Sequence, residues 1–190
     1  MAGAFASCYN LSGSLTIPHN ITIIPEGCFR YCNFGGMLKL HNGITNIHHE
    51  AFCRCGFRGN LILPDNLITL GNNALRENLF SGELKLPESL AVIGDYAFTY
   101  NERLTGTIEI PQDVTTISMG LFEGCSQLEG IVFHKNTDRI NESAFSGCYQ
   151  LNSIVCKSIV PPTIDASAFS GVAKDNFVVE VPESSVADYT

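Results

Sequence analysis

The chain has 190 residues, of which 45% are apolar and 16% charged, and its formal net charge is −8. This apolar share argues against a disordered chain, because ample surface is available for burial. The negative charge argues against sequence-independent binding of nucleic acid, which needs Lys and Arg to neutralise phosphates. No apolar run reaches the roughly 18 to 20 residues of a membrane span. The N-terminus, Met1 to Phe5, shows no basic segment before an apolar core, so no signal peptide is visible.

A bulky apolar residue recurs at spacings of 23 or 24 residues. The series is Phe5, Phe29, Phe52, Leu75, Phe98, Phe122, Phe145 and Phe169. A small or apolar residue precedes each member, and in seven units a cysteine or asparagine follows three positions later. Several columns that recur at one period indicate an array of repeats. We predict a single solenoid domain over residues 1–190 with about eight repeats, of which the first is truncated and the last, about 157–190, is divergent.

The next element of each unit is a pair of apolar residues separated by one position. The pairs are Leu15/Ile17, Leu38/Leu40, Leu61/Leu63, Leu84/Leu86, Ile108/Ile110, Ile131/Phe133, Ile154/Cys156 and Val179/Val181. Their two-residue period predicts a short strand whose alternate side chains point inward. In five units a proline follows directly, and it ends the strand because it has no N–H for a ladder.

A second apolar pair, with two residues between its members, closes most units, as at Leu67/Leu70 and Leu90/Ile93. It predicts a second inward segment. The turn residues that follow, such as Gly94 and Asp95, predict a cap for a short helical or 3-10 stretch that carries the Ala-Phe pair. The pattern therefore predicts an α/β repeat solenoid, whose eight coils at the usual inter-strand spacing would extend roughly 40 Å.

The composite pattern of Ala-Phe-x-x-Cys, two apolar pairs and Gly-Asp resembles the BspA-like branch of leucine-rich repeats, a bacterial cell-surface type of the kind found in Bacteroides. Residues 93–118 match best, and the stretch from Cys156 to Tyr189 resembles the terminal unit of that family. The resemblance implies a right-handed superhelix of short parallel strands and an extracellular or cell-surface location. It also implies a non-catalytic module for adhesion to a protein partner, such as a host matrix protein or another cell-surface protein. A structural spacer and a carbohydrate-binding module that captures a glycan are the alternatives, because repeat folds serve many partners.

Solenoids bind partners along the outward residues of successive strands. The predicted strand-face row is Thr16, Lys39, Ile62, Lys85, Glu109, Val132 and Val155, followed by Glu180. Apolar residues at exposed positions favour a contact surface, although β-branched residues suit strands whatever they face. Tyr31 and Tyr100 share another outward column and offer aromatic contacts.

The cysteines follow the repeat. Five of the eight, at positions 8, 32, 55, 125 and 148, share the column three residues after the aromatic series. We interpret this column as an inward corner ladder in which each side chain meets backbone groups at a turn. Cys28 and Cys156 also occupy core columns, whereas Cys53 shares its column with Arg30 and Arg76. We therefore predict seven buried thiols and one exposed thiol, Cys53. Free thiols are favoured over disulfides, because parallel Cβ vectors suit a disulfide poorly.

Two chemical alternatives involve the same region. A zinc site would use Cys28, Cys32, Cys53 and Cys55 with His48 or His49, but these spacings only loosely resemble structural zinc sites. A nucleophilic pair of Cys53 with either histidine would lack a third, orienting group. The glycines recur once per repeat and indicate tight bends, which disfavours a phosphate-binding loop. We expect a protein that is not an enzyme, with no cofactor and no metal.

Overall fold

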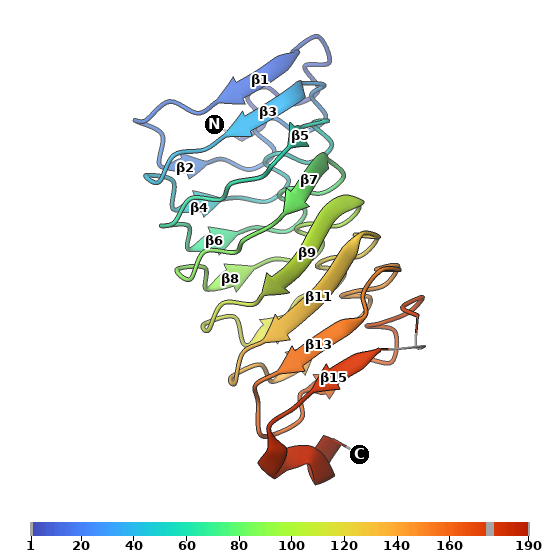
Figure 1. Cartoon of the computed structure of the whole chain (residues 1–190). Coiled ribbons are helices and arrows are strands. Elements are labelled where there is room, and N and C mark those ends of the chain that lie inside the picture. Colours follow the sequence, from blue (N-terminus) through green and yellow to red (C-terminus); the bar gives the residue numbers. More distant parts are fainter. Residues whose placement is uncertain (1, 174–176, 190) are drawn as a thin grey trace.

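In the computed structural model, which describes residues 2–173 and 177–189, the chain winds into stacked coils that form a slightly curved rod (Figure 1). The first series of strands, on one face, is β1 (Gly13–Thr16), β3 (Gly35–Lys39), β5 (Arg58–Gly59), β7 (Leu79–Glu83), β9 (Arg103–Glu109), β11 (Leu128–Phe133), β13 (Ser153–Cys156) and β15 (Val178–Glu180). The second series is β2 (Ile23–Ile24), β4 (Asn46–Ile47), β6 (Thr69–Leu70), β8 (Val92–Ile93), β10 (Thr116–Ile117), β12 (Arg139–Ile140) and β14 (Thr163–Ile164).

Each strand pairs in parallel with its counterpart in the neighbouring coil. The hydrogen-bonded orders are β15-β13-β11-β9-β7-β5 and β1-β3 in the first series, and β2-β4-β6-β8 and β10-β12-β14 in the second. The register joins equivalent residues, as in the pairs of Ile131 with Ile108 and with Ile154. The predicted parallel-strand solenoid is therefore confirmed, with about seven turns.

The stretch that carries the Ala-Phe pair consists of turns, so the prediction of helical or 3-10 turns is not confirmed. Among the described residues only η1 (Glu183–Tyr189) is helical. The reason is a divided hydrogen-bond pattern. The N–H groups of Gly27, Phe29 and Tyr31 donate to carbonyls of the following coil, whereas those between them donate three residues back within the turn. In a helix every backbone N–H would donate within its own segment. Here half of these N–H groups donate to the next coil instead, so the stretch does not form a helix.

Stacked phenylalanine rings form the core. Phe5, Phe29 and Phe52 stack with ring centroids 5.3 and 5.6 Å apart. From Phe98 a second run continues through Phe122, Phe145 and Phe169, with centroid separations of 5.2, 5.9 and 5.2 Å. Leu75 separates the two runs. In the N-terminal coils a parallel ladder of Phe34, Phe57 and Phe80 lies beside the first, with separations of 4.9 and 6.2 Å.

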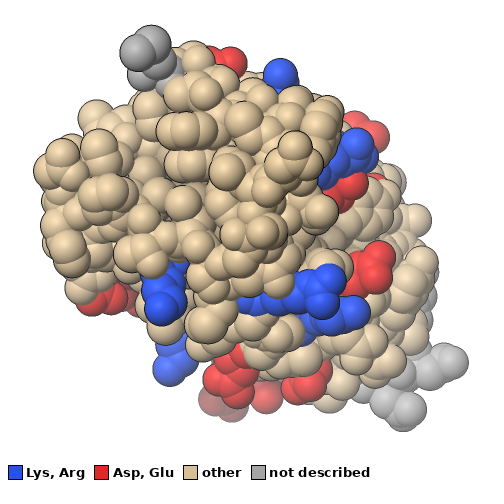
Figure 2. Space-filling model, turned by 90° about the horizontal axis from the view of Figure 1, so that it is seen from above, with Lys and Arg blue, Asp and Glu red and all other residues tan. Residues whose placement is uncertain are grey.

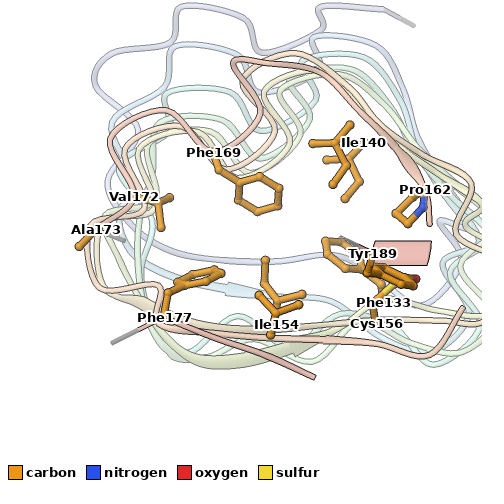
Figure 3. Close-up of a pocket in the computed structure, with 12 residues that line it drawn as sticks. Phe133, Ile140, Ile154, Cys156, Pro162, Phe169, Val172, Ala173, Phe177 and Tyr189 are labelled. Atoms are coloured by element: carbon orange, nitrogen blue, oxygen red, sulfur yellow. The ribbon is translucent and has the colours of Figure 1, made fainter. Parts of the chain in front are cut away.

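Both ends of the stack expose core residues. Seen from above in Figure 2, the N-terminal end presents a broad surface of uncharged atoms with charged side chains around its margin. Phe5 there is 48% exposed. At the other end, apolar side chains including Phe169, Ile154 and Phe177 line a cavity of about 300 Å³ (Figure 3). Tyr189 of η1 closes part of it, and its hydroxyl donates to the carbonyl of Ser158 at 2.8 Å. These ends lack the neighbouring coil that covers the same columns elsewhere.

Candidate functional site

The structure places the predicted strand-face row side by side across the first series. Thr16 pairs with Lys39, and Val132 lies between Glu109 and Val155. The exposed members are Thr16, Lys39, Ile62, Lys85, Glu109 and Glu180. Val132 and Val155 are half-buried, so less of their surface is open to a partner. The geometry of the row thus agrees with the repeat register, while its role in binding stays a prediction.

A groove lies along the row between the coils of β5 and β7. The groove, of about 770 Å³, is lined by Ile62 and Lys85 of the row and by the carboxylates of Asp65, Glu83 and Glu88. The ladder between β5 and β7 joins Arg58 with Leu79 and Gly59 with Phe80. Strand pairing between these two coils therefore ends before the groove residues Ile62 and Lys85.

The charged residues of the row differ in their contacts. Lys157 Nζ lies 2.7 Å from Glu109 Oε1, so Glu109 is paired within the molecule. Lys39 and Lys85 form no ion pair with any residue in the described ranges. Ile62 is 68% exposed, so an exposed apolar side chain shares the groove with Lys85 and with the three carboxylates.

The cysteine column closes one corner of each coil, as predicted. Cys55 Sγ lies 2.9 Å from the carbonyl oxygen of Phe29, one coil toward the N-terminus, and Cys148 Sγ lies 3.2 Å from that of Phe122. Asn78 and Asn101 occupy the same column and donate to the carbonyls of Phe52 and Leu75. The interpretation of an inward ladder that meets backbone groups is confirmed.

The prediction of an exposed thiol at Cys53 is wrong, because Cys53 is only 3% exposed. Arg30 forms an ion pair with Glu50, and Glu77 pairs with both Arg54 and Arg76. Long side chains around Cys53 therefore cover its short side chain. Burial, with the nearby charges of Glu50 and Glu77, raises the pKa of the Cys53 thiol to about 11. A column with half-buried arginine in the adjacent coils can bury a cysteine between them.

Cys8, which lacks a preceding coil, is the half-buried thiol, and the other seven are buried. All eight are free cysteines. Within residues 2–173 and 177–189, no group of three or more His, Cys, Asp or Glu residues is arranged to hold a metal ion. His41 Nε2 lies 3.0 Å from the carbonyl oxygen of Pro18, and its ring tilts against that of His19 at 4.7 Å. These two histidines serve as turn residues.

A second surface, which the repeat pattern only hinted at, lies on the turn side. The column two residues after the aromatic series has positive φ in every coil, from Ser7 to Gly171. Three C-terminal coils use glycine there, but four consecutive coils carry Tyr31, Arg54, Glu77 and Tyr100. A left-handed conformation costs a non-glycine residue roughly 1 to 2 kcal/mol. The signal in the sequence was the shared column of long side chains and glycines, which indicates one backbone conformation.

Comparison with known families decides the assignment. A model of the BspA type leucine rich repeat region matches residues 1–104 and 77–187, with six copies. The chain belongs to the BspA-type leucine-rich repeat family. No curated protein matches it. The described residues of this BspA-type chain hold no helix with the length and apolarity needed to cross a membrane.

Solved structures show the same fold. A leucine-rich repeat protein from Bacteroides ovatus superposes with a TM-score of 0.66 at 20% identity, over 97% of this chain and 64% of that one. A leucine-rich repeat protein from T. pallidum has a TM-score of 0.62 at 27% identity, over 79% of this chain and 69% of that one. The chain thus spans less than two thirds of the Bacteroides ovatus protein. The leucine-rich repeat family is generally non-catalytic, and its BspA type is consistent with a protein-interaction or cell-surface module.

Proposed function

We propose that the chain is a non-catalytic extracellular or cell-surface module that binds a protein partner along its strand-face row. The observation that carries this proposal is the groove beside Ile62 and Lys85, where an exposed apolar side chain and an unpaired lysine lie together. Apolar contacts at the centre with charged groups around them are typical of protein interfaces. The location is the one that the family resemblance implies.

The chemistry of the groove favours a protein partner over a glycan. Its lining contains no aromatic side chain for stacking against a sugar ring. Ile62 offers apolar area. The amine of Lys85 and the three carboxylates of the groove offer charged groups of both signs for pairing with a protein partner. Adhesion to a host matrix protein, or to another cell-surface protein, would use this combination. A structural spacer would need neither the exposed apolar side chain nor the charged groups of this groove.

The test is binding of the purified chain to an immobilised panel of matrix proteins, with a glycan array in parallel. Ile62→Asp combined with Lys85→Glu should weaken binding to the protein partner by at least 10-fold, because it removes the apolar contact and reverses the charge. The matched control combines Ile68→Asp with Lys135→Glu, which are exposed residues outside the row. Equal loss in both variants, or unchanged binding in the first, would remove the site from the strand face. Binding to glycans alone would favour the carbohydrate alternative.

A further inference from the structure

The turn-side column of left-handed residues divides into two parts. In the N-terminal coils the guanidinium of Arg54 lies 5.7 Å from the ring centroid of Tyr31 and its Nε lies 2.6 Å from Glu77 Oε2. Arg30 lies 5.3 Å from the same ring and 2.6 Å from Glu50 Oε2. The molecule thus holds two guanidinium groups between a tyrosine ring and carboxylates.

The C-terminal coils repeat the tyrosine and the carboxylates without the guanidinium. A groove of about 470 Å³ lies between Tyr100 and Tyr149, which are 42% and 63% exposed. The full lining is Tyr100, Glu102, Glu123, Gly124, Ser126, Gln127, Ser146, Gly147, Tyr149 and Gln150. It contains two carboxylates, two amides, two serine hydroxyls and the two tyrosines but no Lys or Arg.

A glycine at position 124 leaves room for a tyrosine ring in this groove. The ring of Tyr100 lies across Gly124, where any Cβ would overlap it. A Cβ at Gly171 would lie 3.4 Å from the ring of Tyr149, and one at Gly147 would lie 3.9 Å from it, so this ring lies near both glycines without occupying their Cβ positions. The ring of Tyr100 is therefore held against the next coil, and both rings leave part of their surface open to solvent.

The two carboxylates of the groove have little compensation. Glu123 Oε1 meets the hydroxyl of Tyr100 at 3.4 Å, and its negative charge raises the pKa of Tyr100. Glu102 forms no side-chain ion pair with any described residue. Residues 96–190 contain five Lys and Arg against twelve Asp and Glu, whereas residues 1–95 contain six against seven. The groove therefore lies in the acidic half of the chain.

We propose that this groove binds an arginine or lysine side chain from a basic segment of a partner protein, at a site separate from the strand face. A guanidinium there would contact the tyrosine rings through cation–π attraction and donate charge-assisted hydrogen bonds to the carboxylates of Glu102 and Glu123. The amide oxygens of Gln127 and Gln150 supply further acceptors for its N–H groups. A guanidinium of the partner would then make the contacts with tyrosine and glutamate that Arg54 makes within this molecule. A neutral sugar could stack on the rings but would leave both carboxylates uncompensated.

The test measures the fluorescence anisotropy of a labelled octa-arginine peptide with the whole chain, at low salt and at 0.5 M salt. Free arginine and maltohexaose serve as competing probes. The key variant is Tyr100→Gly, which removes the ring but suits the left-handed backbone, since glycine occupies this column in three later coils. It should fold normally by circular dichroism and bind the peptide about 10-fold more weakly. Glu123→Gln should weaken binding by a similar factor, because one of the two carboxylates loses its charge.

Two matched variants separate the groove from general charge attraction. Tyr31→Gly makes the same change in the N-terminal part of the column, and Glu129→Gln removes an equal charge from exposed surface outside the groove. Both should keep affinity within about twofold of the original chain. Equal weakening in these controls, absence of peptide binding, or competition by maltohexaose but not by free arginine would overturn the proposal. Ile62→Asp should leave the peptide affinity unchanged, because Ile62 belongs to the strand-face site. Failure of the strand-face proposal can therefore be distinguished from failure of this one.

Discussion

The coils at the centre of the stack and those on either side close the same corner with different chemistry. In the flanking coils a thiol makes one soft contact, as Cys125 Sγ does at 3.3 Å from the carbonyl oxygen of Phe98. In the centre, Asn78 Nδ2 donates to the carbonyls of Phe52 and Leu75 at 2.9 and 3.0 Å. Amide hydrogen bonds are stronger than thiol contacts.

The same centre lacks one member of the main phenylalanine ladder, although Phe80 there still stacks on Phe57. Leu75 interrupts the ladder between Phe52 and Phe98, so two ring contacts are absent there. Asn78 Oδ1 also accepts the N–H of Phe57 at 3.1 Å, which ties its side chain to two coils. The difference teaches that a repeat tolerates loss of stacking in one coil where directional hydrogen bonds hold adjacent coils together. The corner of the central coil is held by polar contacts of Asn78, whereas the cysteine corners of the flanking coils are held chiefly by packing.

The largest expected effect comes from removing the central amide. Asn78→Ala should lower the free energy of unfolding by about 3 kcal/mol, because buried carbonyls and the Phe57 N–H lose their partner. Cys55→Ala, at the equivalent flanking corner, should cost about 1 kcal/mol, since the thiol behaves chiefly as a small apolar group. Urea denaturation followed by circular dichroism measures both.

A control for this comparison is Asn101→Ala. Asn101 makes similar donor contacts to Leu75 and Phe98, but its Oδ1 has no hydrogen-bond partner. Its replacement should therefore cost less than that of Asn78. If Cys55→Ala were as damaging as Asn78→Ala, the distinction between polar and packed corners would be wrong.

Alkaline pH should weaken the flanking corners selectively. Burial raises the pKa of the Cys148 thiol from 9.0 to about 12. The native state therefore keeps its proton where the unfolded state loses it, so this stability is complete below pH 9 and declines as the pH rises toward 12. At pH 10 the loss for this thiol should be about 1 kcal/mol. Urea denaturation at pH 8 and pH 10, with reductant present, measures it.

The matched variant for the pH prediction is Cys148→Asn, which places a non-titrating side chain in a column that accepts asparagine at positions 78 and 101. Its loss of stability between pH 8 and pH 10 should be smaller by about 1 kcal/mol. Other titrating groups are common to both proteins and cancel in the difference. Identical losses would show that the buried thiol contributes nothing to the alkaline response.

The smallest expected effect is a gain. Leu75→Phe should join the two aromatic ladders and raise the free energy of unfolding by about 0.5 kcal/mol, because each stacked pair adds to simple burial. The coil of Phe52 already holds a second ring, Phe57, in edge contact, so the cross-section accommodates both. A thermal melt compares the variant with the original. A fall in stability would mean that Phe80 leaves no room and that overpacking dominates.

The repeat register determined a large part of this protein from sequence alone. The period of 23 or 24 residues located six of the eight strands of the first series, whereas β5 and β7 end before the predicted pairs Leu61/Leu63 and Leu84/Leu86. The shared column of Cys55 and Asn78 indicated an inward corner. These succeeded because stacked coils require each column to meet the same surroundings in every coil. The row from Thr16 to Glu180 followed from the same logic.

Tertiary structure decided what periodicity does not encode. Whether the Ala-Phe stretch forms a helix depended on how its N–H groups divide between its own turn and the next coil. The burial of Cys53 depended on the length and pairing of side chains in adjacent coils, which differ from repeat to repeat. The groove between Tyr100 and Tyr149 likewise arises from residues in three coils. A column specifies the direction of a side chain, but only the stack decides what covers it.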